Sequence, residues 1–399
     1  MYFMRFLRLS AGLIGVLLIA MALAWATSPD PQFNTASFED EPLVEAIAPL
    51  EDAKTLAQFI GGGGAVRTLL VTSFEGDTVM GIDLQELGSN GDANPFDALA
   101  SASDVPSSLE GLSQFPLSEV AFDRLLPSGS SGNRHIGSGT NFPEHADEAN
   151  SESVFGFPKF GSATPARTAV RRPDGILLDY EVELCVRFDR DIASLEDFDA
   201  ATKGVFLCGD FTNRNAIVEL VDPDNLDSGS GFSDAKSGPD FFPTGPFLAI
   251  PNDLDAFVAD LRMTTSLNGE PRQDARGGEM TLNFRQLVEK SLADMSERRF
   301  LYKDGGEFLA EGGTISADMS LMSGTAEGVI FTAPTRGDYV EAIVAYLAAG
   351  GPLSGSGLID IAKGTFVENE LASGHFLQPG DEVRHGSSYL GNIKVDVTD

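Results

Sequence analysis

The segment D-Y-E-V-E-L at residues 179–184 places two glutamates, Glu181 and Glu183, two positions apart. In a β-strand successive side chains point to opposite faces, so the two carboxylates share one face while Val182 and Leu184 share the other. Carboxylates held this close repel each other unless a cation lies between them. The pattern therefore predicts that Glu181 and Glu183 hold a hard divalent metal ion. The alternative is an ordinary half-buried strand with a solvated acidic face.

A third carboxylate, Asp210, lies in a second apolar segment, 205–211, which we expect to be a strand. Three carboxylates with further positions for water suit Mg²⁺ or Mn²⁺, whereas zinc prefers nitrogen and sulfur ligands. Arg214, four residues further on, is a candidate cation for a substrate carboxylate. The alternative for Arg214 is a solvated loop arginine.

His145 and Glu148 are three residues apart after Pro143, which is typical of the first turn of a helix. Residues at this spacing share a helix face, and a carboxylate beside an imidazole fixes its tautomer and raises its basicity. The pair is therefore a candidate general base for activating water. The alternative is the start of a surface helix. The other histidines, at 135, 375 and 385, lack the spacing of metal ligands, and we interpret them as structural or surface residues.

Several segments are expected to position these side chains. Residues 27–42 read as a linker, and we expect a small N-terminal domain to follow, up to about residue 132. Within it we expect a helix over 43–60 and a β-hairpin over 66–84. Further on, Asn268-Gly269 predicts a second hairpin, residues 284–295 and 338–349 predict helices, and residues 377–397 predict a strand, a turn and a strand.

The 399 residues carry a formal net charge of -33, which repels phosphate backbones and argues against a nucleic-acid partner. The two cysteines, Cys185 and Cys208, are too few for a disulfide framework or a cysteine-rich zinc site. Each lies two residues from a carboxylate of interest, so they could lie on neighbouring strands. The sequence leaves open whether they pair, and we favour the interpretation that they are two buried free thiols.

The N-terminus has the features of a targeting segment. Arg5 and Arg8 precede an apolar run over residues 9–26, which contains small-x-small sites around residues 24–26. We expect an exported, periplasmic protein whose residues 1–26 are a signal peptide. The alternative is an uncleaved N-terminal membrane anchor. Cleavage after Ala26 would remove Trp25, the one tryptophan of the chain.

Seven short motifs follow one another along most of the chain. They are N-F-x-x-H-x-x-E at 141–148, D-Y-E-x-E-L at 179–184, D-x-x-x-R at 210–214, K-S at 236–237 with P-x-G-P at 243–246, N-G-E at 268–270, S-G-T-A-E-G-V at 323–329 and L-x-P-G-D at 377–381. In this order, from about residue 137 to 397, the chain resembles the fumarylacetoacetate hydrolase family.

The resemblance implies an α+β, predominantly β fold: a mixed β-roll with peripheral helices over residues 133–399, preceded by a small N-terminal domain. It implies a homodimer that holds Mg²⁺ or Mn²⁺ at Glu181, Glu183 and Asp210. By position, His145 and Glu148 would activate water. Lys236 and Arg214 would hold an enolate or a carboxylate, and Thr325 would touch the substrate.

The chain also departs from the family pattern. Ile217 stands where the family usually has glutamine, and residues from about 331 to 370 look inserted. Our hypothesis is a metal-dependent hydrolase that cleaves a C–C bond in a 2-oxo or β-diketo carboxylic acid. The alternatives are a decarboxylase, hydratase or isomerase of the same family, or an exported binding protein with a metal site and no turnover, which Ile217 favours.

Overall fold

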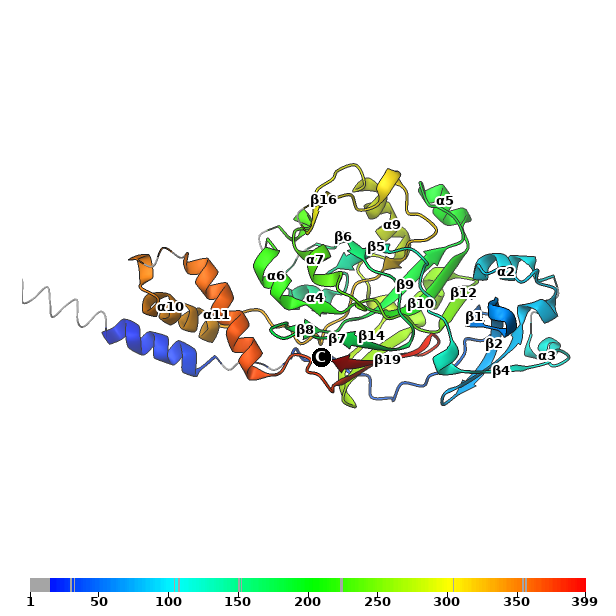
Figure 1. The fold of residues 1–399 in the computed structure, drawn as a ribbon, viewed down its shortest axis with the longest axis horizontal. Helices are drawn as coiled ribbons and strands as arrows, with labels where there is room; N and C mark the ends of the chain where they lie inside the picture. The colour runs from blue at the N-terminus through cyan, green and yellow to red at the C-terminus, as the bar shows by residue number, and fades with distance from the viewer. Residues whose placement is uncertain are drawn as a thin grey trace, which may run out of the picture. The chain divides into compact units, whose positions relative to one another are not determined.

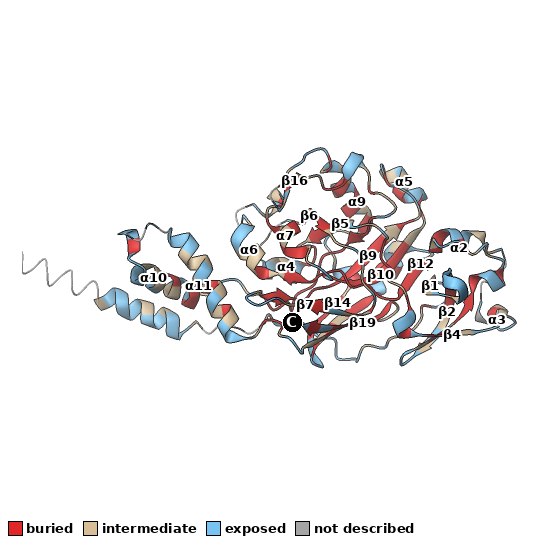
Figure 2. Cartoon of the chain, in the orientation of Figure 1, coloured by how far each residue is buried: buried red, intermediate tan, exposed pale blue. Residues whose placement is uncertain are grey.

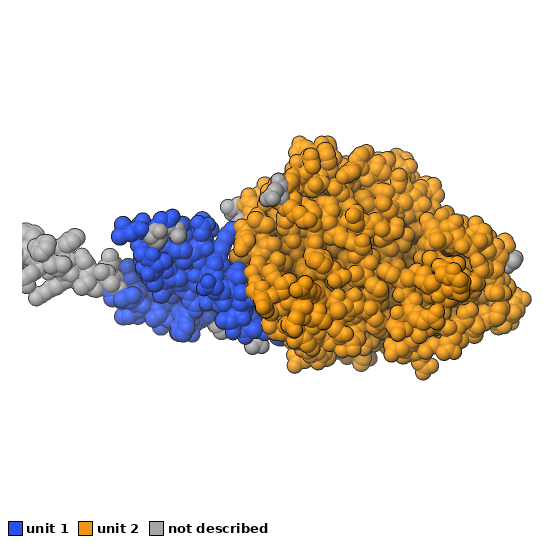
Figure 3. Space-filling model, viewed as in Figure 1, with its two compact units in different colours: residues 1–34, 330–376 blue, residues 35–329, 377–399 orange. Residues whose placement is uncertain are grey.

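The structure is a computed structural model. It describes residues 15–28, 31, 33–103, 105–106, 108–149, 151, 153–222, 225–303, 305–353, 355 and 357–399. The first 14 residues of the predicted targeting segment therefore lie outside the described residues. The chain divides into two compact units: unit 1 comprises residues 1–34 and 330–376, and unit 2 comprises residues 35–329 and 377–399 (Figure 3).

A ten-stranded sheet forms the centre of unit 2 (Figure 1). All neighbours in it are antiparallel except β17 and β5. Its strands are, from edge to edge, β4 (Ser118–Ala121), β3 (Thr78–Asp83), β2 (Val66–Glu75), β1 (Ala53–Ile60), β12 (Phe247–Pro251), β10 (Lys203–Gly209), β9 (Val182–Phe188), β17 (Leu321–Met322), β5 (Arg134–Gly139) and β6 (Phe155–Phe160).

Three smaller sheets complete the β-structure described in unit 2. The five-stranded sheet runs in the order β14 (Glu270–Arg276), β13 (Arg262–Leu267), β18 (Glu382–Ser387), β19 (Gly391–Thr398) and β7 (Arg167–Arg171). The two-stranded sheets pair β8 (Leu178–Asp179) with β11 (Thr212–Asn213) and β15 (Phe300–Tyr302) with β16 (Gly305–Glu307).

Short helices surround these sheets, and the buried residues lie mainly on the strands (Figure 2). The longest of them in unit 2, α9, begins at a reciprocal capping box between Asn283 and Gln286. The helices are α2 (Pro95–Ser101), α3 (Leu109–Leu112), α4 (Pro143–Glu148), α5 (Leu195–Ala200), α6 (Arg214–Leu220), α7 (Phe232–Lys236), α8 (Leu254–Asp260) and α9 (Phe284–Ala293). The 3₁₀ turns are η1 (Gly62–Gly64), η2 (Leu84–Leu87), η3 (Phe122–Arg124), η4 (Leu226–Ser228), η5 (Gly277–Glu279) and η6 (Glu311–Gly313). The predicted α+β class, with mixed β-sheets and outer helices, is confirmed.

Both predicted hairpins are confirmed, as β2–β3 and β13–β14. The second one turns at Asn268 and Gly269, whose φ angles of 53° and 83° are typical of a type I′ turn. The predicted helix over 43–60 is wrong. Pro49 lies in the middle of that segment, where it would break a helix, and residues 53–60 form β1 between β2 and β12.

The expectation of two free thiols is also wrong, because Cys185 and Cys208 form a disulfide. Cys185 lies on β9 opposite Phe206, and Cys208 lies on the adjacent β10 opposite Glu183, two residue pairs along the antiparallel register. Both side chains are fully buried in the hydrophobic core, together with Phe206 and Met322. The bond therefore joins two adjacent strands near the middle of the ten-stranded sheet.

Unit 1 is helical. Residues 15–26 form its first helix, and the predicted insertion forms α10 (Arg336–Ala348), the turn η7 (Gly351–Leu353) and α11 (Leu358–Ser373). Thr335 and Asp338 cap the start of α10 reciprocally, so the predicted helix at 338–349 is confirmed. Among the described residues, no helix has the length and apolar character needed to cross a bilayer. The domain boundaries expected from the sequence otherwise stay predictions.

Candidate metal centre

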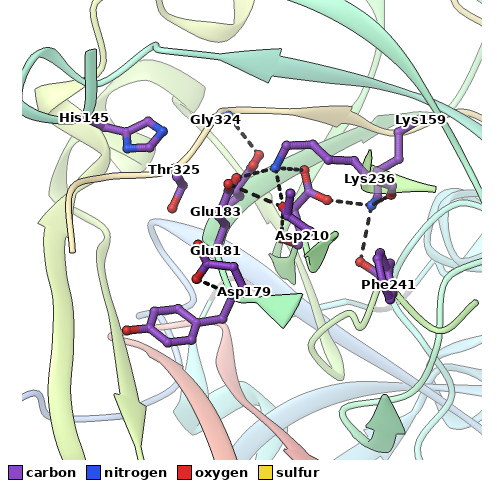
Figure 4. A network of polar contacts seen from close by, with 12 residues as sticks. His145, Lys159, Asp179, Glu181, Glu183, Asp210, Lys236, Phe241, Gly324 and Thr325 are labelled. Atoms are coloured by element: carbon purple, nitrogen blue, oxygen red, sulfur yellow. Dashed lines mark hydrogen bonds and ion pairs between the residues drawn. The ribbon is translucent and has the colours of Figure 1, made fainter. Parts of the chain in front are cut away.

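Three carboxylates from two paired strands meet inside unit 2 (Figure 4). β9 and β10 pair with Val182 opposite Gly209, so the residues just beyond that pair, Glu181 and Asp210, are brought together. The Asp210 N–H donates to the Glu181 carbonyl at an N···O distance of 2.9 Å. Carboxylate oxygens of Glu181, Glu183 and Asp210 lie within 4.8 Å of one another. All three residues are buried, so the alternative of a solvated acidic face is wrong.

The two glutamates experience opposite electrostatic environments. Burial disfavours the charged form of Glu181, but the Lys236 ammonium (Nζ···Oε2 2.6 Å) and the Arg214 guanidinium (Nη2···Oε1 2.9 Å) outweigh it and lower the pKa of Glu181 to about 2. Burial raises the pKa of Glu183 well above its usual range, and the carboxylates of Asp210 and Glu181 raise it further. The negative charge of the cluster is thus least compensated at Glu183.

Two buried lysines contact the cluster from different elements. Lys159, on β6, donates from Nζ to Asp210 Oδ1 (2.6 Å) and to the carbonyl of Phe241 (3.3 Å). Lys236, at the end of α7, lies between Glu181 Oε2 and Asp210 Oδ2 (3.0 Å). Burial lowers the pKa of Lys159. For Lys236, burial is outweighed by the Asp210 and Glu181 carboxylates, which raise its pKa.

Arg214 is the first residue of α6 and points back into the protein. Its Nε donates to Asp179 Oδ2 (2.8 Å) and its Nη2 donates to Glu181 Oε1 (2.9 Å). The planar guanidinium suits this two-sided contact. Arg214 therefore orients a carboxylate of the cluster, and the alternative of a solvated loop arginine is wrong because the residue is buried. Its predicted contact with substrate stays a prediction.

His145 and Glu148 lie one turn apart on α4, as predicted, and their side chains are hydrogen-bonded (Nδ1···Oε2 2.8 Å). The Gly328 N–H donates to the other oxygen, Oε1, of Glu148 (3.0 Å). We assign the ring proton to Nδ1 from this contact, which leaves Nε2 as a proton acceptor. Figure 4 shows the imidazole on the side of the cluster where Glu181 and Thr325 lie.

The S-G-T motif holds the strand that carries the ligands. The Gly324 N–H donates to Glu183 Oε2 (2.8 Å), and Thr325 Oγ1 donates to the Val182 carbonyl (2.9 Å). Gly324 has a φ of +82°, and a Cβ atom there would lie 3.1 Å from the Ser138 carbonyl oxygen. Only glycine meets both requirements without strain. The predicted contact of Thr325 with substrate stays a prediction.

Three residues of the site had no role in the sequence prediction. Lys159 stands in an aromatic strand, F-G-F-P-K-F, and a lysine surrounded by buried positions was the signal available for it. Asp179 was part of a motif but was given no role. Gln273 Nε2 donates to Thr325 Oγ1 (2.9 Å), and Gln273 Oε1 accepts from the Val182 N–H (3.1 Å). Gln273 stands among other polar residues of β14, so the sequence did not distinguish it as a residue of the site.

The residues of the cluster fit a divalent cation. The donor set consists entirely of carboxylate oxygens, which hard cations prefer. Asp210 Oδ2 is buried and forms an ion pair with the Lys236 ammonium (3.0 Å), but it accepts no hydrogen bond from the described residues, so this oxygen retains a lone pair for a ligand. The raised pKa of Glu183 marks a second carboxylate that a cation would stabilise in its charged form. Glu181, Glu183 and Asp210 are therefore the residues that would hold the metal.

Comparison with known proteins identifies the family to which the chain belongs. The sequence model of the fumarylacetoacetate hydrolase C-terminal domain matches residues 134–398, about two thirds of the chain. The chain belongs to the fumarylacetoacetate hydrolase family. Family members are enzymes, among them hydrolases, isomerases and decarboxylases, and they use divalent metals. The acidic cluster of this member is thus a candidate metal centre of an enzyme family.

Individual relatives are distant. An uncharacterized protein of Staphylococcus epidermidis is 29% identical over 172 residues, which are 42% of this chain and 54% of that protein. The chain thus spans about half the length of the curated relatives it matches. The solved fumarylacetoacetate hydrolase of the psychrophile Exiguobacterium antarcticum is similar with a TM-score of 0.54 and 18% identity, over 86% of this chain and 99% of that one. A Mycobacterium smegmatis protein provisionally assigned as HpcE has a TM-score of 0.51 and 22% identity, over 86% and 99%. At these identities the likeness shows a shared fold.

Proposed function

We propose that the protein is a divalent-metal-dependent hydrolase that cleaves a C–C bond in a 2-oxo or β-diketo carboxylic acid, of the fumarylacetoacetate or acylpyruvate class. The observation that supports this proposal most strongly is the buried cluster of Glu181, Glu183 and Asp210 beside the hydrogen-bonded pair of His145 and Glu148. A hard cation such as Mg²⁺ or Mn²⁺, bound to the three carboxylates, supplies Lewis acidity toward the oxygens of such a substrate.

The residues of the chain account for the proton transfers. Glu148 holds His145 with Nδ1 protonated, so that Nε2 can take a proton from water. The water oxygen then bonds to the acyl carbon, the C–C bond breaks, and its electron pair stays on the leaving fragment as an enolate. A proton returned from His145 completes the second product. Lys236, an ammonium held in the cluster, adds fixed positive charge for the developing enolate.

The test follows the loss of acylpyruvates, a fumarylacetoacetate-like diketone and oxaloacetate, each with Mg²⁺ and with chelator. We expect hydrolysis of an acylpyruvate or the diketone that requires the metal. In His145→Gln we expect kcat to fall by a factor of about 10² to 10⁴, because a positioned base contributes that much. Metal affinity, measured by calorimetry, should be unchanged in that variant and lost in Glu183→Gln.

His375→Gln is the matched control, because His375 also pairs with a glutamate, Glu370, but in unit 1. It should keep full activity. Consumption of oxaloacetate alone, with release of CO₂, would identify a decarboxylase instead. Turnover of none of these compounds, with metal still bound, would favour the binding protein.

A further inference from the structure

Exposed apolar side chains are concentrated in unit 1. Among the described residues, 13 large hydrophobic side chains of unit 1 are exposed, compared with 6 in unit 2, although unit 1 is only about a quarter as long. Exposed apolar residues scattered singly are ordinary, but a concentration of them marks an interaction surface. The chemistry of this interaction surface on unit 1 indicates which kind of partner covers it.

The first part of this surface is the helix at residues 15–26. Its sequence, G-V-L-L-I-A-M-A-L-A-W-A, is apolar on every side, and Val16, Leu17, Leu18 and Ile19 are 54–64% exposed. A helix that is hydrophobic all round belongs in a protein core or in lipid. The apolar run also continues backwards to residue 9 in the sequence, where Arg8 precedes it. An apolar stretch that follows basic residues is typical of a segment whose apolar part lies in a bilayer and whose basic residues lie at the headgroups.

The second part is the tip of the α10–α11 hairpin. The sequence has no charged residue from 342 to 359, and Val344, Leu347, Leu353 and Ile359 are 55–94% exposed there. Such an uncharged, apolar tip is unusual in a chain with a net charge of -33. The acidic character of the rest of the protein would favour a charged tip if the tip faced water.

The one charged residue near the tip on α10 is turned inward. Glu341 accepts a hydrogen bond from Trp25 Nε1 (2.7 Å) and another from Asn369 Nδ2 on α11. The carboxylate thus joins the N-terminal helix to both helices of the hairpin, and α10 carries no charged residue beyond Glu341 toward the tip. The two apolar parts therefore belong to one compact unit, within which Glu341 links the N-terminal helix to the hairpin.

We propose that unit 1 docks on a lipid bilayer, with the tip of the α10–α11 hairpin inserted among the acyl chains next to the N-terminal helix. Trp25 and Tyr339, 56% and 61% exposed, are residues typical of the membrane–water boundary. α10 has 13 residues and is about 20 Å long, short of the roughly 30 Å hydrocarbon core, so it lies in the interface and does not span it. The hairpin tip has no charged residue from 342 to 359, so its insertion is hydrophobic and insensitive to salt.

The test measures co-flotation of the full chain with neutral phosphatidylcholine vesicles. The hairpin variant carries Leu347→Glu, Leu353→Glu and Ile359→Glu. The matched control carries Ile60→Glu, Leu117→Glu and Leu301→Glu, three substitutions of the same kind at positions of unit 2 that are 44–57% exposed. Both sets are compared in the wild-type chain and in a Leu18→Glu/Leu23→Glu background, which weakens the N-terminal helix as a contact.

We expect the hairpin variant to lower the partition coefficient by a factor of about 10 or more, because three buried apolar side chains are lost from the lipid. The control should stay within a factor of about two. Equal partition of the hairpin variant and the control in both backgrounds would overturn the proposal. So would unchanged flotation together with a shift from dimer to monomer in sedimentation, which would make this surface a contact with a second copy of the chain.

A reporter variant tests the depth of the tip without weakening it. In Trp25→Phe/Leu353→Trp the single tryptophan lies at a position that is 94% exposed in the wild-type chain. Vesicles should shift its emission to shorter wavelength, and brominated acyl chains should quench it. An emission maximum that stays at the value for water while the protein co-floats would show that the tip lies outside the lipid, and would overturn the proposal. Unchanged Mg²⁺ affinity of unit 2 serves as the check that each variant is folded.

Discussion

Each carboxylate of the metal centre is balanced by different neighbours. Glu181 faces the Lys236 ammonium and the Arg214 guanidinium, and Asp210 faces Lys159 and Lys236. Glu183 receives a backbone hydrogen bond from the S-G-T loop. Buried like charges are stable only where such partners are in place, so loss of one partner costs more than a surface contact would. The positions of these partners therefore decide how well the centre binds metal.

Gly324→Ala tests the backbone partner of Glu183. An alanine at φ +82° is strained, and its Cβ meets the Ser138 carbonyl, so we expect the free energy of unfolding to fall by about 1–2 kcal/mol. Displacement of the N–H from Glu183 should also lower Mg²⁺ affinity about tenfold, as loss of a ligand-orienting contact does. Gly312→Ala is the matched control, because Gly312 has a φ of +71° and open space around its Cβ position. The same loss of affinity in both variants would contradict this role of Gly324.

Two buried histidines predict how stability depends on pH. Burial lowers the pKa of His385 to about 3 and that of His135 to about 4. In the unfolded chain both take up a proton near pH 6.5, so between about pH 6.5 and these values the unfolded state binds more protons. The contribution of these two histidines to stability is therefore complete above about pH 6.5 and falls as the pH decreases, by up to about 1.4 kcal/mol per pH unit for each histidine.

Urea unfolding between pH 7.5 and 5 measures this slope. His385→Gln, which keeps a polar group near Thr265, should make the slope shallower, because one of the two titrating groups is removed. A slope equal to that of the wild type would be incompatible with a neutral buried His385.

At the scale of elements, the register of β9 and β10 brings the ligands together. One residue of slip would turn Glu183 to the opposite face of the sheet. The disulfide between Cys185 and Cys208 joins these same two strands, and Cys208 lies directly opposite the ligand residue Glu183. It therefore opposes slip and separation of the strands on which the metal centre depends.

Reduction of this disulfide should lower the free energy of unfolding by about 3 kcal/mol, since it closes a loop between residues 23 positions apart. Guanidinium unfolding with and without dithiothreitol measures the difference. The Cys185→Ala/Cys208→Ala variant is the control, and its midpoint should not respond to the reductant. An equal midpoint for the wild type under both conditions would count against the bond.

Local signals in the sequence were enough for much of this arrangement. Alternation marked the ligand strand, Pro143 marked the helix of the His–Glu pair, and Asn268-Gly269 marked a hairpin. The pairing of strands that are far apart in the chain could not be predicted from the sequence. The apolar residues of 53–60 are spaced as in a helix, but pairing with β2 on one side and β12 on the other makes this segment a strand. The partners of Cys185, Asp179 and Lys159 likewise depend on which strands become neighbours, and a single sequence does not encode that in its local pattern.

At the scale of the whole molecule, the disulfide supports the proposal that the protein is exported. Disulfides persist in oxidising compartments such as the periplasm and are rare in the cytosol. The contact between Trp25 and Glu341 supports retention of the N-terminal helix as an anchor, because cleavage after Ala26 would remove one of the groups that Glu341 binds.

Mass spectrometry of the protein from the membrane fraction tests this retention. We expect a mass that includes residues 1–26, a tryptophan emission from Trp25, and an oxidised Cys185–Cys208 bond. A mass that begins after residue 24 or 26, without tryptophan emission, would instead identify a cleaved signal peptide.

The residues that flank the helical insertion on either side, Gly328 and Leu377, both bind to one short segment within unit 2. Before the insertion, the Gly328 carbonyl accepts from the Tyr180 hydroxyl, and after it the Leu377 N–H donates to the Leu178 carbonyl. A segment that departs and returns at adjacent points is topologically a surface loop, however long it grows. Such a segment can be lengthened, shortened or exchanged without changing the order in which the strands of unit 2 pair.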